Sequence, residues 1–234
     1  MIPMDKLLFL FAIPVALLAQ RVVEPGNAAK APSDAIVLFD GSNLDGWTNK
    51  AGGPAGCKAT NGELHCSSGA GDIYTKYKFK DVQMHIEFAP PLMDGQKGQL
   101  RGNSGVYIHG LYEIQILDSF NNPTYATGMA AALYGQAPPL VNAARPPEQW
   151  QVYDIIFHAP RCGADGKLIA QGTVTVLWNN VLAQDQTPIL ESAKSCEADR
   201  AGEAGALMLQ DHSGFKGAPH TTMRFRNLWI RPIR

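Results

Sequence analysis

Short runs in which hydrophobic and polar residues alternate follow one another along most of the chain. In residues 82–89, VQMHIEFA, every second residue is apolar, which is typical of a half-buried β-strand. Residues 150–159 and 171–178 alternate in the same way, and no stretch of twelve or more residues has a helical period. The pattern predicts an all-β fold, a β-sandwich or jelly roll of two antiparallel sheets.

The segment RGNSGVYIHGLYEIQILDSF, residues 101–120, predicts a β-hairpin that turns at Gly110. A three-residue connection pairs Ile108 with Tyr112 and makes one face wholly apolar. A two-residue connection would bury Glu113 beside Ile108, and a slip of one residue turns every side chain to the opposite face. We therefore expect the first register. The other face is then polar and carries Asn103, Tyr107, Glu113 and Gln115.

The four cysteines predict two disulfides. In CKATNGELHC an Asn-Gly pair, the strongest short hairpin signal, sets Cys57 opposite Cys66. This is a non-hydrogen-bonded pair, where Cα atoms come within about 4.5 Å, close enough for a disulfide. By elimination, Cys162 pairs with Cys196. A zinc site is not expected because no Cys-x-x-Cys pair exists. Disulfides indicate an exported protein, periplasmic or extracellular.

The N-terminus has the character of a secretory signal. Residues 1–20 contain an apolar run at 7–18, too short to span a bilayer comfortably, and Ala19 offers a cleavage point. A retained N-terminal anchor is the alternative. Residues 21–34, with Pro, Gly and several Ala, are expected to form a linker. The remainder, 35–234, is expected to be a single jelly-roll domain, so the mature chain would have no membrane span.

Composition excludes one class of partner. The formal net charge is −1 with 45% hydrophobic residues, whereas a nucleic-acid-binding protein would carry a concentrated basic stripe. The C-terminal arginines are expected to lie on a solvated strand face. Residues 121–148 form a long irregular stretch with five prolines. Loops of this length are usually functional or disordered, and its Tyr, Asn and Arg content predicts a loop folded over a polar site.

Two further strands are predicted near the C-terminus, ALMLQDH and TMRFRNLWIRPI. Alternation would place Met208, Gln210 and His212 on one face of the first. It would likewise place Phe225, Asn227 and Trp229 on one face of the second. His85, on the polar face of residues 82–89, is expected to be solvated.

Candidate chemistry is distributed over strand positions, because the sequence has no phosphate-binding glycine loop, nucleophile elbow or His-x-x-x-His pair. Each candidate alone has a structural explanation. Together on one face, under a loop, they are typical of a sugar-binding groove. The candidates are Asn103, Tyr107, Glu113, Gln115, Asp118, Asn142, Arg145, Gln210 and His212.

The runs LFDGSNLDGW, GNSGVYIHGLYEIQILDS, ALYGQAPPLVNAARPPEQWQVYDI, LMLQDHSG and MRFRNLWIRPI together resemble the 3-keto-disaccharide hydrolase family. Its domain is also called the 3-keto-glucoside 1,2-lyase/3-keto-2-hydroxy-glucal hydratase domain. The resemblance spans about residues 36–233 and implies a concanavalin A/laminarinase-like jelly roll. Two departures stand out. His109 occupies a position where the family often has Arg, and residues 187–203, with Cys196, look particular to this chain.

The resemblance implies a reaction. A ketone at C3 of a glucoside acidifies the C2 proton, a base removes it, the C1 aglycone leaves, and water adds to the glucal. Glu113 or His212 would be the base, and Arg145 or Asn142 would hold the enolate oxygen. A divalent metal bound by Glu113, Asp118 or His212 is an open alternative, and no other cofactor is implied. The expected substrate-binding residues are Asn103, Tyr107, His109, Gln115, Asp118, Asn142 and Gln210.

Two other functions compete with this one. A jelly roll also hosts lectins, so a non-catalytic carbohydrate-binding module is the alternative. A conventional laminarinase-like glycosidase needs two carboxylates about 5–10 Å apart. On the strand that carries Glu113, the next residue of the same face is Gln115, which disfavours that mechanism.

Overall fold

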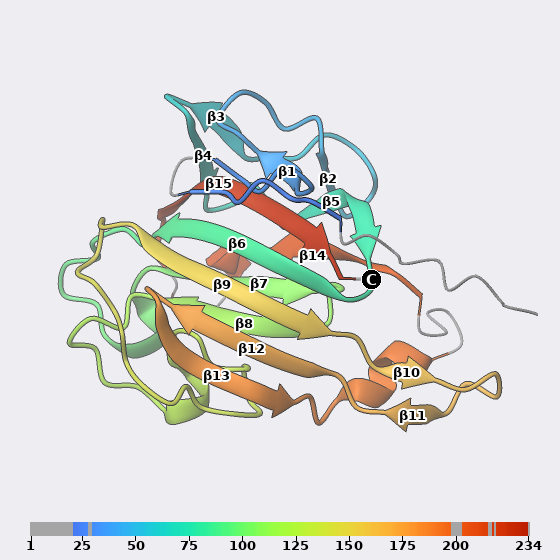
Figure 1. The fold of residues 1–234 in the computed structure, drawn as a ribbon. Coiled ribbons are helices and arrows are strands. Elements are labelled where there is room, and N and C mark those ends of the chain that lie inside the picture. Colours follow the sequence, from blue (N-terminus) through green and yellow to red (C-terminus); the bar gives the residue numbers. More distant parts are fainter. Residues whose placement is uncertain (1–20, 28–29, 198–202, 215–216, 218, 234) are drawn as a thin grey trace, which may run out of the picture.

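The computed structural model describes residues 21–27, 30–197, 203–214, 217 and 219–233 (Figure 1). The predicted signal peptide, residues 1–20, lies outside them. Two antiparallel sheets pack against each other, which confirms the predicted all-β sandwich. No helix in this described part is long and apolar enough to cross a membrane.

The larger sheet has eight strands and lies in front in Figure 1. Its strands run in the order β13-β12-β9-β6-β15-β4-β3, with β1 also paired to β15. Their bounds are β13 Val181–Pro188, β12 Thr173–Trp178, β9 Gln151–His158, β6 Val82–Ala89, β15 Thr222–Pro232, β4 Glu63–Ser67, β3 Lys58–Thr60 and β1 Ile36–Phe39.

The smaller sheet has five strands in the order β2-β5-β14-β7-β8. Their bounds are β2 Trp47–Asn49, β5 Ile73–Phe79, β14 Gly205–Leu209, β7 Asn103–Ile108 and β8 Tyr112–Leu117. A separate hairpin, β10 Arg161–Cys162 and β11 Leu168–Ala170, projects to one side (Figure 1). The described residues also form four short 3-10 helices: η1 Gly98–Leu100, η2 Ala126–Gly128, η3 Ser192–Cys196 and η4 His212–Gly214.

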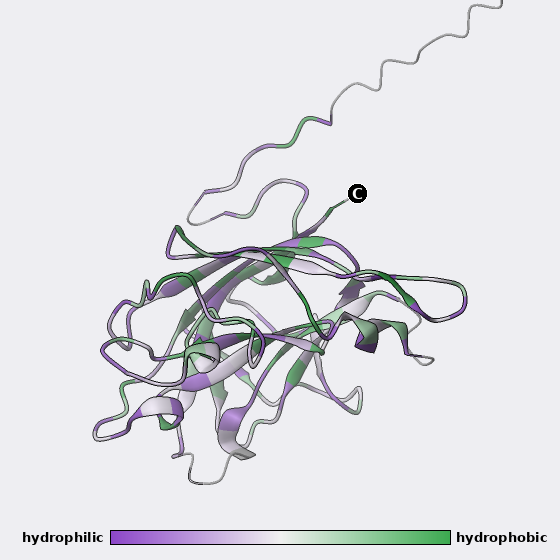
Figure 2. Cartoon of the chain, turned by 90° about the horizontal axis from the view of Figure 1, so that it is seen from below, coloured by the Kyte–Doolittle hydropathy of each residue, from purple (hydrophilic) through white to green (hydrophobic). Residues whose placement is uncertain are grey.

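The core lies between the two sheets because each contributes one apolar face. On β6, Val82, Met84 and Ile86 are almost fully buried, as the alternation predicts, and on β8 Ile114 and Ile116 are fully buried. Figure 2 shows hydrophobic and hydrophilic residues alternating along the strands. Burial of this apolar area stabilises the sandwich by about 25 cal/mol per Å². It also leaves the opposite face of the smaller sheet free to carry polar groups.

Strand β15 corrects one prediction. Asn227 has φ 48° and lies where the pairing with β6 shifts between Arg226 and Trp229. This β-bulge inserts one extra residue and reverses the alternation beyond it. Phe225 and Leu228 therefore point into the core, and the expectation that Phe225, Asn227 and Trp229 share a face is wrong.

His85 also differs from expectation, since it is not a solvated histidine. Its ring stacks on Trp229 with centroids 5.2 Å apart, and its side chain is only 13% exposed. Its Nδ1 lies 2.7 Å from Asp154 Oδ1, and its Nε2 lies 3.5 Å from Glu87 Oε1. The outer face of the larger sheet thus carries a semi-buried charge cluster.

Both predicted disulfides are confirmed. Cys57 and Cys66 are joined with their Cα atoms 4.5 Å apart, the spacing expected from the Asn-Gly hairpin, and Cys162 is joined to Cys196. The second disulfide ties the β10–β11 hairpin to η3.

Candidate active site

The β7–β8 hairpin has the register that the alternation predicts. Ile108 pairs with Tyr112 and Tyr107 pairs with Glu113. The polar face of this hairpin points away from the core and forms the floor of a cavity of about 400 Å³. The cavity is lined by Gln99, Asn103, Tyr107, Glu113, Gln115, Tyr125, Tyr134, Gln210, Asp211 and His212.

Among the described residues, Glu113 is one of the two carboxyl groups that line this cavity. Tyr107 donates its hydroxyl proton to Glu113 Oε2 at 2.7 Å, and Gln210 Nε2 donates to the Tyr107 oxygen at 3.1 Å. Burial raises the pKa of Glu113 to about 7, against the lowering effect of the Tyr107 hydrogen bond. Burial and the Glu113 charge raise the pKa of Tyr107, so it remains a phenol and a donor. A carboxyl group with this pKa exchanges protons readily near neutral pH.

Gly105 makes room for this carboxyl group. It lies on the same face of β7, and a Cβ there would be 2.5 Å from Glu113 Oε1 and 2.7 Å from Tyr107 Cε2. Any side chain larger than hydrogen would therefore push both functional groups aside. Sequence reasoning did not single out this glycine.

The long loop of residues 121–148 supplies two tyrosines to the rim. Its segment 131–134 runs along the free edge of β8, where the Tyr134 amide donates to Glu113 O at 2.9 Å. This pairing places Tyr134 beside Glu113. The hydroxyls of Tyr125 and Tyr134 lie 2.6 Å apart, and burial raises the pKa of Tyr125 to about 12. The prediction that this loop folds over the polar site is confirmed by these two side chains.

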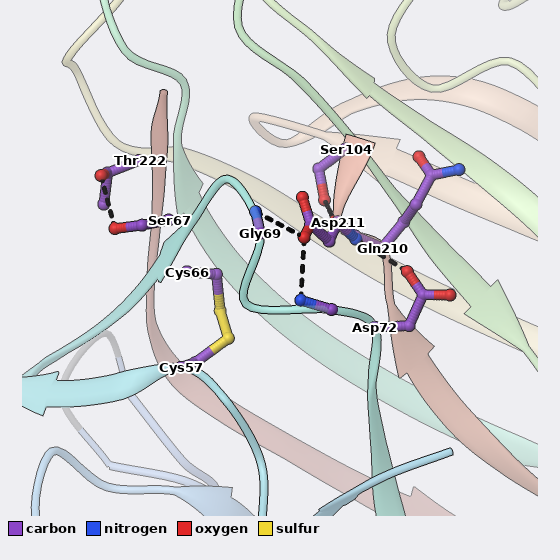
Figure 3. Close-up of a disulfide and its surroundings, with 10 residues drawn as sticks. Cys57, Cys66, Ser67, Gly69, Asp72, Ser104, Gln210, Asp211 and Thr222 are labelled. Carbon is purple, nitrogen blue, oxygen red and sulfur yellow. Dashed lines mark hydrogen bonds between the residues drawn. A yellow bond between two sulfur atoms is a disulfide. The ribbon is translucent and has the colours of Figure 1, made fainter. Parts of the chain in front are cut away.

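Asp211, the residue before His212 in the cavity wall, is held by the hydrogen bonds that Figure 3 displays. The Asp211 carboxylate accepts hydrogen bonds from the Gly69 and Gly71 amides at 2.9 and 2.8 Å, and Asp72 Oδ1 accepts one from the Asp211 amide at 2.9 Å. Gly69 and Gly71 follow Cys66 within five residues, so the Cys57–Cys66 disulfide lies close to the loop that binds the Asp211 carboxylate. Burial lowers the pKa of His212, which keeps its imidazole neutral at neutral pH.

Asp211 is the second carboxylate of the cavity, and it is fully engaged. Burial would raise its pKa, but hydrogen bonds from Ser213, Gly71 and Gly69 outweigh this and lower it. Asp211 is therefore an ionised turn residue and a poor proton donor. In a conventional two-carboxylate mechanism the raised pKa of Glu113 would make it the acid, and Asp211 would have to act as the nucleophile or base, but both Asp211 carboxylate oxygens already accept hydrogen bonds from backbone amides.

The cavity brings together six of the ten predicted site residues. These are Asn103, Tyr107, Glu113, Gln115, Gln210 and His212. The remaining four lie elsewhere. Asp118 is buried in an ion pair with Arg101, whose Nη2 is 2.5 Å away. Asn142 donates to the backbone oxygen of Ser119, and Arg145 donates to that of Trp150. His109 is 6% exposed at the hairpin turn, with its ring among aromatic residues of the core.

The proposed metal ligands are not assembled. Glu113 and His212 line the cavity, but Asp118 does not, and its carboxylate is paired with Arg101. Within the described ranges no group of three His, Cys, Asp or Glu side chains could hold a metal ion. The residues present do not fit the alternative of a divalent metal bound by Glu113, Asp118 or His212.

A jelly roll with an amide-rich, tyrosine-rimmed cavity on the outer face of one sheet defines a carbohydrate-active protein of the glycosyl hydrolase type. Residues 34–231 match the model of a family described as the 3-keto-alpha-glucoside-1,2-lyase-like domain. The chain belongs to this family.

Solved structures agree with this assignment. A protein from Parabacteroides distasonis ATCC 8503 described as a "putative glycosyl hydrolase" is 41% identical, with a TM-score of 0.82. The match covers 96% of this chain and 94% of that one. A second protein of the same description and organism is 19% identical, covers 86% of this chain and 94% of its own, and has a TM-score of 0.59, which shows the fold alone. No curated protein matches the chain.

Proposed function

We propose that the protein cleaves 3-keto-glycosides by removing the C2 proton and eliminating the C1 aglycone, followed by hydration of the resulting glucal. The observation that carries this proposal is the environment of the Glu113 carboxyl group. This carboxyl group has a pKa raised to about 7 by burial and is fixed by Tyr107. The other cavity carboxylate, Asp211, is held by backbone amides. A tuned carboxyl group whose neighbouring carboxylate is already engaged by backbone amides suits proton abstraction next to a carbonyl.

Glu113 takes the C2 proton, and the C2–H electron pair forms a C2=C3 bond while the ketone oxygen becomes an enolate. Of the two phenol protons of Tyr125 and Tyr134, one is used in their mutual hydrogen bond. The other can donate to the enolate oxygen. This pair replaces Arg145 and Asn142, which lie outside the cavity.

The enolate then returns its electrons, re-forms the ketone, makes a C1=C2 bond and breaks the C1–O1 bond. The departing O1 takes the proton that Glu113 received, so the carboxylate is restored. Water next adds across C1=C2, with hydroxyl to C1 and a proton to C2. His212, neutral and in the same cavity, is the group that we assign to proton transfer with this water. The sum is hydrolysis of the keto-glycoside.

The test is to incubate the purified protein with a 3-keto-glucoside and with its unoxidised parent, each with and without a chelator. Cleavage of the keto compound alone supports the proposal. Cleavage of both compounds would indicate a conventional glycosidase. If neither compound is cleaved, the result would indicate a lectin-like module. Glu113→Gln should lower kcat by roughly 10²–10⁴-fold, the usual contribution of a general base. The matched control is Glu191→Gln, which changes an exposed carboxylate of the η3 region and should not alter kcat.

We further propose that the protein is exported, with residues 1–20 as a cleaved signal and residues 35–234 as a single domain. The two disulfides are consistent with secretion. Fractionation of the producing cells and N-terminal sequencing of the mature protein test this proposal. A mature protein that still begins at Met1 would contradict cleavage.

A further inference from the structure

The amide side chains of the cavity floor are oriented by groups that can only accept hydrogen bonds. Gln99 Nε2 donates to the Gly128 carbonyl oxygen at 2.9 Å and to Thr124 Oγ1 at 3.1 Å. A backbone carbonyl cannot donate, so the Gln99 nitrogen must face it. The Gln99 Oε1 atom is thereby turned towards Asn103 and Gln115.

This orientation is passed on to two neighbours. Gln99 Oε1 accepts from Gln115 Nε2 at 3.1 Å and from Asn103 Nδ2 at 3.2 Å. Asn103 Nδ2 also donates to the Gln99 backbone oxygen at 2.9 Å. Because their nitrogens are committed, these two amides have only their oxygens left to offer.

A second acceptor-only anchor orients Gln210. The hydroxyl group of Tyr107 donates its hydrogen bond to the Glu113 carboxylate. Its oxygen can therefore only accept a hydrogen bond from Gln210 Nε2. The amide oxygen of Gln210 is left over in the same way. Gln99 and Tyr107 thus perform the same task from two sides of the floor.

Three buried amide oxygens result, Asn103 Oδ1, Gln115 Oε1 and Gln210 Oε1, and none accepts a hydrogen bond from any residue in the described ranges. Asn103 and Gln115 are only 5% and 2% exposed. Buried acceptors without donors are rare in folded proteins, and a ligand that supplies donors would satisfy them.

We propose that this floor is a subsite for hydroxyl donors, which recognises a glucoside through hydroxyl groups that donate to Asn103, Gln115 and Gln210. The side chain of Gln99 is the positioning group that fixes the polarity of Gln115, and its backbone oxygen fixes that of Asn103. The inference rests on the proposed function for the identity of the ligand as a glucoside. It also orients the oxidised substrate. A ketone oxygen can only accept, so the C3 ketone points away from these oxygens and towards the phenols of Tyr125 and Tyr134.

Deoxyfluoro sugars test this subsite directly, because fluorine is close to hydroxyl in size but cannot donate. The affinities of methyl α- and β-glucopyranoside are compared by titration calorimetry with those of their 2-, 3-, 4- and 6-deoxyfluoro analogues. For the anomer that binds, two or more of the four analogues should each bind at least fivefold more weakly than the parent. In each of these analogues the fluorine leaves a buried amide oxygen without a hydrogen-bond donor. Affinities all within twofold of the parent would overturn the inference, as would a lack of binding by both parents.

Variants separate positioning from structural support. Gln115→Met removes one acceptor and should abolish the fluorine penalty at one position. Gln99→Met frees the amide of Gln115 to turn, so the hydroxyl-to-fluorine affinity ratio should approach one at the position that Gln115 serves, while Asn103 stays oriented by the backbone oxygen of residue 99. A purely structural role for Gln99 would weaken parent and analogue equally and leave that ratio unchanged. Gln83→Met, on the opposite sheet, is the control and should preserve the wild-type ratio.

The outcome can be distinguished from that of the proposed function. Cleavage of a 3-keto-glucoside without any fluorine penalty would leave the reaction standing and remove the subsite. A clear fluorine penalty without such cleavage would support the subsite and contradict the proposed reaction. If Gln99→Met does not fold, the ligand series on the wild-type protein still decides the matter.

Discussion

The carboxylate of Glu113 lies across the backbone of Gly105, so close that a β-carbon on this glycine would be 2.5 Å from Oε1. Two adjacent strands thus share one small space. β8 supplies the acid side chain, and β7 supplies the residue without a side chain that admits it. The position of the proposed base depends on both.

Gly105→Ala should therefore impair catalysis while the fold persists. Displacement of Glu113 and Tyr107 by about 1 Å should lower kcat/KM by roughly 10²-fold, the loss typical of a misplaced catalytic group. The control is Gly46→Ala, because a Cβ there meets nothing nearer than a carbonyl oxygen at 3.7 Å. Steady-state kinetics with a 3-keto-glucoside and circular dichroism spectra of both variants check this. An active Gly105→Ala variant would show that Glu113 need not lie where it does.

The pH dependence of kcat/KM should have an acid limb near pH 7. The base must be ionised to accept a proton, and burial raises the pKa of Glu113 to about 7, so activity should rise as pH increases through that value. The Tyr107 hydrogen bond lowers this pKa, so Tyr107→Phe should move the limb to higher pH. A limb below pH 6.5 that Tyr107→Phe leaves in place would instead assign the base to His212, whose pKa is lowered by burial.

The charge cluster around His85 should make stability depend on alkaline pH. Burial alone would lower the pKa of His85, but hydrogen bonds to Asp154 and Glu87 outweigh it and raise the value to about 9. A raised pKa contributes stability that is complete below about pH 6.5 and is lost as pH rises through about 9. We expect a loss of about 2–3 kcal/mol between pH 7 and pH 9.5.

Urea unfolding of His85→Phe measures this contribution, because the variant keeps a ring against Trp229 but cannot be charged. It should lose most of the alkaline dependence. His158→Phe changes an exposed histidine and should keep the dependence. Equal pH profiles for His85→Phe and the wild type would rule out the cluster as its source.

The two disulfides should differ in what they support. The cysteines that they join are separated by 9 and 34 residues in the sequence. Loop-closure entropy therefore stabilises the folded state by about 3 kcal/mol for the first disulfide and by about 4 kcal/mol for the second. Removing Cys162–Cys196 by double serine substitution should lower the unfolding temperature more. Removing Cys57–Cys66 should impair kcat/KM more, because the loop after Cys66 clamps Asp211 beside His212. The opposite order in kcat/KM would contradict this link.

The sequence predicts the central hairpin well because one face of it is buried. Alternation over Val106, Ile108, Ile114 and Ile116 leaves a single register that keeps Glu113 out of the core, and the structure has that register. The Cys57–Cys66 pairing follows from an Asn-Gly turn in the same way. Where burial constrains each position, local pattern determines the result.

The rest of the site comes from irregular backbone, where the sequence has no alternation of hydrophobic and polar residues from which side-chain positions could be predicted. Tyr125 and Tyr134 reach the cavity because their loop pairs along β8, and Gln99 reaches it from η1. Asn142 and Arg145 come from the same loop, but their side chains satisfy backbone carbonyls instead. The bulge at Asn227 reversed a face for a similar reason, since one extra residue cannot be seen in the alternation itself.

The most direct test of the central claim is the fate of the hydrogen at C2. A 3-keto-glucoside carrying deuterium at C2 is cleaved by the wild-type protein in ordinary water, and the released sugar is analysed by mass spectrometry against the labelled 3-keto sugar incubated alone. Proton removal by Glu113 predicts that the enzymatic product has lost its deuterium from the first turnover. A product that retains the full label would contradict elimination and with it the assigned role of Glu113.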